Sequence, residues 1–213
     1  MMRATEARLY IVIEAGKDPR AVEGLLTASG AAVLLIAPAC GNPLDASAVK
    51  PLVDVALAKG VAALIESDAR LARTLRADGV HLPWSKDVVA RYGEAREVLG
   101  GRFIVGADAG RSRHDAMTLA EAGADYVGFG IPRHVEDREA ARARRLDLVE
   151  WWSEIIEVPC VAFDVETEED AAALIEAGAD FVAVRAPADL RPTELSRWAH
   201  DLAQALAAPE DVA

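Results

Sequence analysis

The sequence predicts a (β/α)8 barrel, the TIM-barrel fold, because one junction between a helix and a strand recurs along the chain. Residues 119–130 read LAEAGADYVGFG, and residues 174–185 read LIEAGADFVAVR. In both copies an amphipathic helix ends at a glycine, which suits the left-handed backbone of a helix C-cap, and an apolar strand follows. Weaker copies lie at residues 27–38 and 75–83. This repeated unit is typical of an α/β protein whose parallel sheet closes on itself.

Eight apolar segments have the length and composition of strands that are buried on both faces. Short connections and helical segments separate them, so one helix would follow each strand. The expected strands are, in order, residues 8–13, 31–38, 62–66, 79–83, 103–108, 126–130, 160–165 and 181–186.

Helical periodicity fills the intervals, and several helix starts are marked in the sequence. Ser112 and Thr167 are good N-caps, and acidic residues follow both of them, which suits a helix N-terminus. Pro192 suits the first position of the last helix, because the N–H that proline lacks has no helical partner there. Helices are expected over residues 43–59, 112–121, 167–177 and 192–206, among others.

The length and composition fit one folded unit. A chain of 213 residues is near the lower limit for one barrel of this kind. We therefore expect a single domain over residues 1–213, with the barrel at about 8–206 and a short frayed tail at 207–213. With 52% hydrophobic and 27% charged residues, intrinsic disorder is not expected.

The net charge of −12 argues against a general surface for nucleic acid or anionic membranes, since both need clustered Lys and Arg. It leaves room for a small phosphorylated metabolite held in one local basic pocket. No segment approaches the roughly 20 apolar residues of a membrane span, and residues 1–8 contain no signal-peptide core. Cys40 and Cys160 are expected near opposite ends of the barrel, so we expect no disulfide and a cytoplasmic protein.

Acidic residues stand at the carboxyl ends of the odd-numbered strands, the end at which such barrels carry their chemistry. Carboxylates that converge repel one another unless a cation or a shared proton lies between them. One interpretation is a divalent-metal site, because hard oxygen ligands suit Mg²⁺; the other is that these groups cap helices or pair with arginines. The residues are Glu14, Glu66, Asp68, Asp108 and Asp164, with Arg185 at the end of the last strand.

The connection over residues 131–140 is the longest, and it contains Arg133, His134 and Arg138. Arginine forks match phosphate geometry, so this segment could bind an anion. Acidic residues lie between the arginines, and a solvated loop and helix face would explain the same composition. His134 could act as an acid or base near neutral pH, whereas His81 lies within a strand and is expected to be a hydrogen-bonded structural histidine.

Five motifs, spread over most of the chain, carry a resemblance to a known family. They are LYIV in the first strand, RADGVHLP across the fourth, VGADAGRSRHDA around the fifth, EAGADYVGFG at the sixth and VPCVAFDVETEEDAAALIEAGADFVAV across the last two. Over residues 8–206 the chain resembles thiamine phosphate synthase and the related thiazole tautomerases. The resemblance implies the barrel fold and a reaction with Mg²⁺, in which hydroxymethylpyrimidine diphosphate is joined to a thiazole phosphate and pyrophosphate is released.

The same resemblance implies roles for particular side chains. Such a reaction needs a metal ion and cationic donors on the departing diphosphate. Arg138 would replace the lysine that the family has in the loop after the sixth strand. The implied residues are Glu66, Asp68 and Asp87 for Mg²⁺, Arg133, Arg138 and Arg185 for phosphate, and Arg138 and His134 for catalysis.

Several positions depart from the pattern of the family. Ala37 and Ala39 stand where the family has an arginine and a lysine, and Asp164 and Val165 replace a Gly-Gly pair whose amides receive phosphate. Four functions are therefore open: an altered synthase, a tautomerase-like isomerase with His134 as proton shuttle, a non-catalytic relative that binds a small molecule or a protein partner, and a different enzyme whose acidic mouth binds a cationic substrate or a metal. Because one of these alternatives is non-catalytic, the sequence also leaves open whether the chain is an enzyme.

The tryptophans allow two interpretations. Trp84, Trp151 and Trp152 either pack within the barrel or line a pocket or an interface. A homodimer is compatible with the second interpretation.

Overall fold

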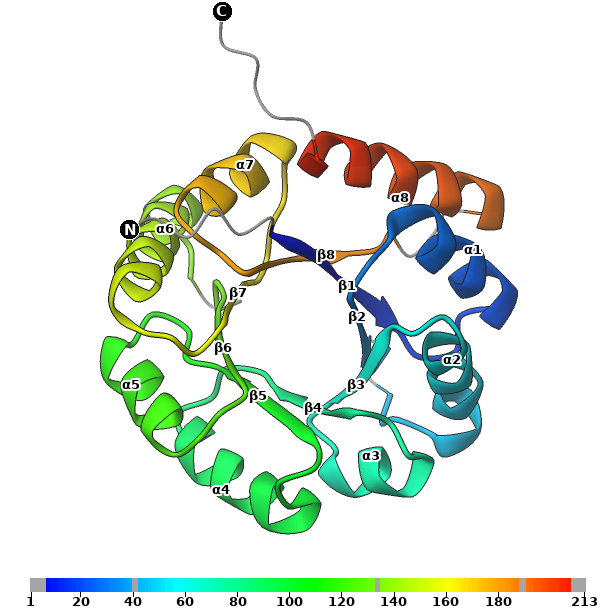
Figure 1. Cartoon of the computed structure of the whole chain (residues 1–213), viewed down its shortest axis with the longest axis horizontal. Helices are drawn as coiled ribbons and strands as arrows, with labels where there is room; N and C mark the ends of the chain where they lie inside the picture. The colour runs from blue at the N-terminus through cyan, green and yellow to red at the C-terminus, as the bar shows by residue number, and fades with distance from the viewer. Residues whose placement is uncertain (1–6, 40–41, 133–134, 188–190, 208–213) are drawn as a thin grey trace, which may run out of the picture.

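The computed structural model describes residues 7–39, 42–132, 135–187 and 191–207, and in these ranges eight parallel strands form a closed barrel (Figure 1). Each strand pairs with the next along the chain, and the last strand pairs with the first. The expected eight strands and the (β/α)8 architecture are confirmed. The strands are β1 (Arg8–Glu14), β2 (Val33–Ala37), β3 (Ala62–Glu66), β4 (Gly79–Leu82), β5 (Ile104–Asp108), β6 (Tyr126–Phe129), β7 (Cys160–Ala162) and β8 (Phe181–Arg185).

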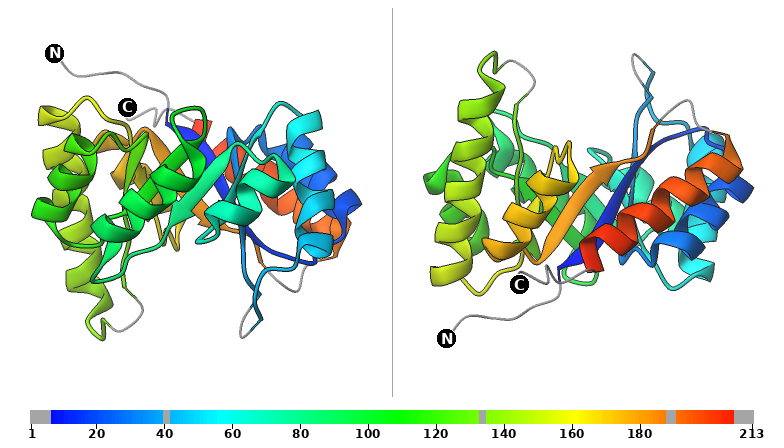
Figure 2. Two further views of the ribbon diagram at one scale, coloured as in Figure 1. Left: turned by 90° about the horizontal axis from the view of Figure 1, so that it is seen from below. Right: turned by 90° about the horizontal axis from the view of Figure 1, so that it is seen from above.

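One helix follows each strand, and the helices flank the strands on the outside of the barrel (Figure 2). Ser112 and Thr167 cap α5 and α7 as expected, since each hydroxyl accepts a hydrogen bond of 3.1 Å from the amide three residues on. Within the described ranges, no helix is long and apolar enough to cross a membrane. The helices are α1 (Pro19–Ser29), α2 (Ala46–Ala58), α3 (Ala69–Leu75), α4 (Val88–Leu99), α5 (Arg113–Glu121), α6 (Arg138–Ile155), α7 (Glu168–Glu176) and α8 (Pro192–Ala207).

Most element boundaries lie within two residues of the expected ones, and two differ by three residues. The helix expected over residues 43–59 begins at Ala46, because the side chain of Asp45 accepts a hydrogen bond from the Ser47 amide and caps it there. The strand expected over 160–165 ends at Ala162, because Asp164 has a left-handed backbone with φ of 57° and leaves the extended conformation. Asp164 is therefore part of the loop after β7.

The repeated junction holds neighbouring strands together. Gly123 and Gly178 have φ of 88° and 94°, the left-handed conformation expected at these helix ends. The aspartate directly before β4, β6 or β8 accepts a hydrogen bond from an amide at the start of the preceding strand. These bonds run from Ala63 N to Asp78 (2.7 Å), from Val105 N to Asp125 (2.8 Å) and from Cys160 N to Asp180 (2.9 Å).

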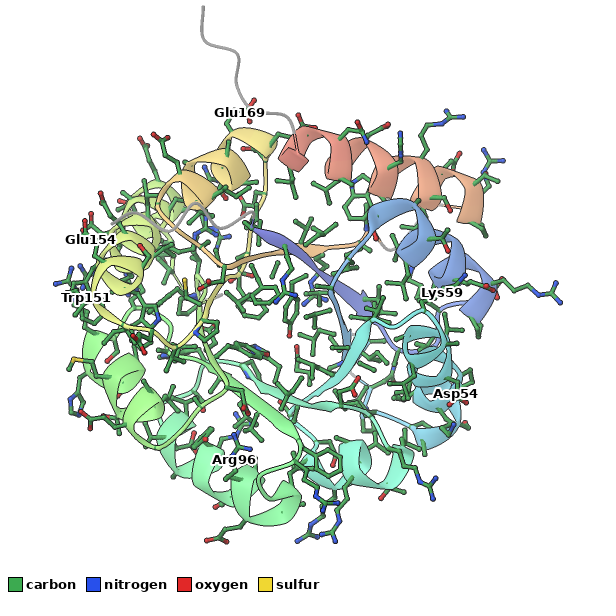
Figure 3. All side chains as sticks on the ribbon, viewed as in Figure 1. Asp54, Lys59, Arg96, Trp151, Glu154 and Glu169 are labelled. Carbon is green, nitrogen blue, oxygen red and sulfur yellow. The ribbon has the colours of Figure 1, made fainter. Side chains whose placement is uncertain are left out.

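Side chains fill the inside of the barrel, so there is no open channel along its axis (Figure 3). The hydroxyl of Tyr126 lies 3.0 Å from that of Tyr10 and 2.9 Å from Nδ1 of His81, and Phe163 stacks on His81 with ring centroids 4.4 Å apart. Gly106 admits the Tyr126 ring, because a Cβ there would lie 2.0 Å from its Cζ. Burial lowers the pKa of His81 to about 3, so this histidine is neutral and structural, as expected.

Candidate functional site

Asp108 lies at the carboxyl end of β5, and among the residues that the structure describes it is the carboxyl group of the barrel mouth that is buried. It is 8% exposed, and its Oδ1 accepts hydrogen bonds from the amides of Gly110 (2.6 Å) and Gly130 (3.1 Å). Burial, and secondly the nearby charge of Asp164, raise its pKa to about 6, although the two amides oppose that shift. This carboxyl group therefore changes its charge close to neutral pH.

Asp164 faces the same short segment from the loop after β7. Its Oδ2 accepts a hydrogen bond of 2.8 Å from the amide of Ile131. A Cβ on Gly130 would lie 2.4 Å from Oδ2 of Asp108 and 2.9 Å from Oδ2 of Asp164. Glycine at position 130 thus lets both carboxyl groups approach the loop after β6, and the two form one carboxyl pair.

The arginines of α6 are held by the protein's own carboxylates. Glu166, in the loop after β7, accepts hydrogen bonds from Arg138 (2.6 Å) and Arg142 (2.5 Å), and the Arg138 side chain lowers the pKa of Glu166 most. Arg145 is fully buried and donates to Asp170 and to the carbonyl of Phe163. Arg138, expected to bind phosphate, is therefore already in an ion pair.

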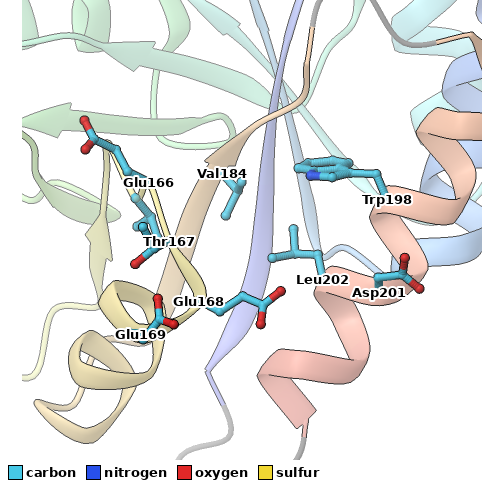
Figure 4. A pocket seen from close by; sticks show the side chains of 9 residues that line it. Glu166, Thr167, Glu168, Glu169, Val184, Trp198, Asp201 and Leu202 are labelled. Atoms are coloured by element: carbon cyan, nitrogen blue, oxygen red, sulfur yellow. The ribbon is translucent and has the colours of Figure 1, made fainter.

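An open pocket of about 490 Å³ lies between the start of α7 and one side of α8 (Figure 4). Val184, Trp198 and Leu202 form its apolar part. Four carboxylates line it as well: Glu166, Glu168, Glu169 and Asp201. Among the described residues of its lining there is no Lys or Arg, so these residues offer no direct cationic contact to a phosphate.

A second open pocket, of about 340 Å³, lies where the loops after β4, β5 and β6 meet. Lys86 and Arg111 bring two positive charges to it, and Asp115 brings one negative charge. Trp84 and Pro132 contribute flat side chains, and Ser112, the cap of α5, completes the lining. Trp84 therefore lines a pocket, whereas Trp152 is fully buried and packs against Phe129.

Lys86 and Arg111 were not among the site residues that the sequence suggested. Both residues follow the end of a strand by a few positions, and this placement is the one feature of the sequence that could have pointed to them as site residues. Arg111 lies within the VGADAGRSRHDA motif, but neither that motif nor any periodic pattern separates a site cation from an ordinary surface cation.

The residues expected to hold Mg²⁺ do not gather into a metal site. Oδ1 of Asp68 accepts a hydrogen bond of 2.8 Å from the Leu71 amide and caps α3. Asp87 stands at the start of α4, where a hydrogen bond from Ser85 lowers its pKa most. No group of three or more His, Cys, Asp or Glu side chains with the geometry of a metal site occurs among the described residues. The present arrangement does not fit a shared ion, and the Mg²⁺ site stays a prediction.

The remaining expected residues lie around the mouth or outside the described part of the chain. Glu14 and Glu66 end β1 and β3, and Arg185 ends β8 with an exposed side chain. Arg133 and His134 fall in the segment 133–134, outside the described residues. The proton-shuttle and phosphate-binding roles suggested for them stay predictions.

Comparison with known proteins identifies the scaffold. The family model described as thiamine monophosphate synthase matches residues 9–187. A thiamine-phosphate synthase of Erythrobacter litoralis is 43% identical over 137 residues, which cover 63% of each chain, and one of Rhodospirillum centenum is 36% identical over 185 residues, which cover 84% of this chain and 88% of that one. The chain thus spans less than two thirds of the length of the first relative and most of the second.

A solved structure supports the same fold. Thiamine phosphate pyrophosphorylase from Pyrococcus furiosus superposes with a TM-score of 0.74 over 95% of this chain and 96% of that one, at 20% identity. At this identity the likeness concerns the fold, while the family model and the Rhodospirillum relative concern descent. This chain belongs to the thiamine monophosphate synthase family.

Proposed function

We propose that this member of the family carries out acid–base chemistry of the isomerase type on a small heterocyclic molecule at the barrel mouth. The observation that carries the proposal is Asp108, a buried carboxyl group at a strand end with a pKa raised to about 6. A group that titrates close to the working pH is suited to taking up and returning a proton.

The geometry around Asp108 supports this role. Both described hydrogen bonds to its side chain end on Oδ1, from Gly110 and Gly130, so that oxygen is fixed and Oδ2 is the one for a ligand. In the carboxylate form Asp108 takes a proton from one atom of the ligand, and the protonated acid returns it to another atom. Substrate and product then have the same composition, and no co-reactant is required.

The other half of the mouth supports an altered reaction. Transfer from a diphosphate needs cations or amides that receive the departing group. Here Arg138 and Arg142 are bonded to Glu166, and the Ile131 amide is bonded to Asp164. These donors have partners that a diphosphate would have to displace.

The second candidate is the synthase reaction itself. It is favoured by the 36% identity, over most of both chains, to the Rhodospirillum centenum relative named thiamine-phosphate synthase. In this candidate Arg185 and Arg138 would contact phosphate, and Glu66, Asp68 and Asp87 would have to move together around Mg²⁺.

One pair of assays separates the two candidates. The purified chain is incubated with hydroxymethylpyrimidine diphosphate, thiazole phosphate and Mg²⁺, with the Rhodospirillum centenum protein alongside, and thiamine phosphate is measured. In parallel, a non-aromatic tautomer of the thiazole phosphate is offered in D₂O, and its isomerisation and deuterium uptake are followed.

We expect no thiamine phosphate, and an isomerisation whose rate rises as the pH passes through about 6, where Asp108 becomes the carboxylate. Asp108→Asn should slow it by about 10²–10⁴-fold, the usual contribution of a positioned proton-transfer group. Asp147→Asn, an exposed change on α6, is the matched control. Synthase turnover, or isomerisation that survives Asp108→Asn, would overturn the proposal.

A further inference from the structure

We propose that the open pocket between α7 and α8, the α7–α8 groove, is the docking site for a basic amphipathic helix of a protein partner (Figure 4). Its walls are the apolar side chains of Val165, Val184, Trp198 and Leu202. Exposed carboxylates surround them: Glu166, Glu168, Glu169 and Asp201. The groove lies on the outer wall of the barrel, so the inference does not depend on proton transfer by Asp108.

The outer wall of the barrel is incompletely covered at this groove. In a (β/α)8 barrel the ring of helices buries the outward-facing side chains of the strands. Those of β2 to β7 are 0–2% exposed here, as Ile65 and Phe129 illustrate. Val184, which faces outward from β8, is only half-buried, and Trp198 and Leu202 of α8 are half-buried beside it. A strip of apolar surface is therefore left uncovered between α7 and α8.

The packing of α8 explains why this strip is uncovered. The helix lies mainly against α1, its neighbour on the side away from α7 (Figure 1). Gly24 of α1 permits the close approach, because a Cβ there would lie 2.7 Å from Oγ of Ser196 on α8. A helix packed so closely on α1 does not cover the side of β8 that faces α7. The groove is thus a consequence of the fold.

The form of the groove suits a helix better than a strand. Its floor is the outer face of β8, and β8 lies between β7 and β1 in the closed barrel. An added strand needs a free sheet edge, whereas a helix packs on the face of a sheet. An amphipathic helix can lay anchors at positions i, i+3 or i+4 and i+7 between two flanking helices. Here those flanking helices are α7 and α8.

The charges around the groove favour a basic partner. Every charged side chain of its described lining is a carboxylate. Glu166 is bonded to two arginines of α6, but no ion pair is described for Glu168, Glu169 or Asp201. Lys and Arg side chains beside the apolar face of a docked helix would complement these three charges.

Residues 208–213 of the same chain do not have the charge that the groove requires. They follow α8 directly and read APEDVA, with two carboxylates and no Lys or Arg. In the groove they would add negative charge to three carboxylates without described partners, and like charges repel. The charge pattern therefore favours a separate, basic helix as the occupant.

Binding is tested by calorimetric titration of the full chain with three synthetic peptides of about 15 residues, the length at which isolated helices begin to form. The first is an amphipathic helix of leucine and lysine. The second has glutamate in place of lysine, and the third has the composition of the first with its leucines spread around the helix. Salt at about 0.15 M screens the long-range attraction of the acidic chain for any cation.

The first peptide should bind at least about tenfold more tightly than the other two, because it alone combines an apolar face with positive charge. Equal affinity for the third peptide would show that charge alone attracts it. Equal affinity for the second would show that charge has no part in binding. Either result would overturn the inference.

A pair of double variants tests the charges of the groove. Glu168→Gln with Asp201→Asn removes two of its carboxylates, and Glu94→Gln with Glu97→Gln removes two exposed carboxylates of α4 as the control. We expect the groove variant to bind the first peptide about three- to thirtyfold more weakly, and the control to lose less than about twofold. Equal losses in the two variants would contradict docking at the groove.

Leu202→Ser tests the apolar wall, and Leu57→Ser, at a side chain 40% exposed on α2, is its control. We expect Leu202→Ser to weaken the first peptide by about five- to tenfold and the control to leave its affinity unchanged. The indole N–H signal of Trp198, assigned with a Trp198→Phe variant, should shift on binding. Circular dichroism and thermal unfolding check that each variant is folded. Should Leu202→Ser fold poorly, the Trp198 signal of the unaltered chain decides, and a signal that the peptide leaves unchanged would refute the inference.

Sedimentation of the chain alone tests a second copy of the chain as the other occupant. A monomer supports a separate partner. A dimer that Leu202→Ser dissociates and Leu57→Ser leaves intact would assign the groove to self-association, and the inference would be wrong.

Discussion

Two sides of the barrel mouth carry arginines and differ in whether those arginines have partners. On the side of β6 and β7, Arg138, Arg142 and Arg145 are bonded to Glu166 and Asp170. On the side of β4 and β5, Lys86 and Arg111 line a pocket without a described ion pair. The first side has more cations, and the two cations of the second side have no described ion-pair partner. We therefore expect the partners of a cation, more than the number of cations in a segment, to decide whether it can meet an anion.

The largest expected effect tests whether the β7 side is structural. Arg145→Met would leave Asp170 and the Phe163 carbonyl without their buried partner and should lower the free energy of unfolding by about 3–5 kcal/mol. Arg111→Met, on the other side, should change it by less than about 0.5 kcal/mol. Urea unfolding at pH 7 measures both free energies of unfolding. A similar decrease in the two variants would contradict the difference proposed between the two sides.

An effect of intermediate size is expected for the carboxyl pair of Asp108 and Asp164, through the dependence of stability on pH. The pKa of Asp108 is about 6 in the folded chain against 3.8 ordinarily, so the folded state binds this proton more tightly than the unfolded chain does. The resulting stabilisation is complete below pH 3.8 and is lost as the pH rises through 6. Two units correspond to about 3 kcal/mol. Asp108→Asn should therefore remove a fall in stability of that size between pH 4 and 7.

The measurement is urea unfolding at a series of pH values, with Asp147→Asn as the control that keeps the slope. In the variant the amide oxygen can still accept from Gly110 and Gly130, so the loops stay in place. A variant with the same pH dependence as the wild type would show that another group titrates in this range.

The smallest expected effect on stability comes from a change that would free the arginines on the side of β6 and β7. Glu166→Gln removes the charge that holds Arg138 and Arg142, at a cost of at most about 1 kcal/mol because the three side chains are 36–41% exposed. The two arginines would then be free for an anion. Titration with inorganic phosphate should show a new weak site, which Glu168→Gln, a charge change at the start of α7, should not create. Absence of such a site would mean that the arginines need Glu166 to keep their place.

The fold was predictable because its signals are local. A glycine such as Gly123 needs a left-handed backbone, and the apolar strand after it needs burial on both faces, wherever the rest of the chain lies. The boundary at Asp164 was missed because its left-handed backbone comes with a bond to Ile131, on another loop. Nothing in the sequence around residue 164 announces that contact.

The site was predictable only in part, because its chemistry depends on pairs from different loops. Asp108 was expected at the mouth, and the structure adds the burial and the neighbour that raise its pKa. Arg138 was expected to meet phosphate, but its partner Glu166 is 28 positions away. The pocket lined by Trp84, Lys86 and Arg111 joins residues of different loops, and the Trp84 indole lies close to Gly110 of the next loop, a contact that no residue pattern encodes.

The aspartates of the repeated junction have a consequence for the way the barrel is assembled. Asp78, Asp125 and Asp180 join β3 to β4, β5 to β6 and β7 to β8, while Ala32 stands at the corresponding place before β2. The sheet is continuous, but these side-chain hydrogen bonds occur in only three of its strand pairs among the described residues. Each bond closes one β-α-β unit, which consists of two strands and the helix between them. We therefore expect each pair of strands with its helix to open locally as one unit.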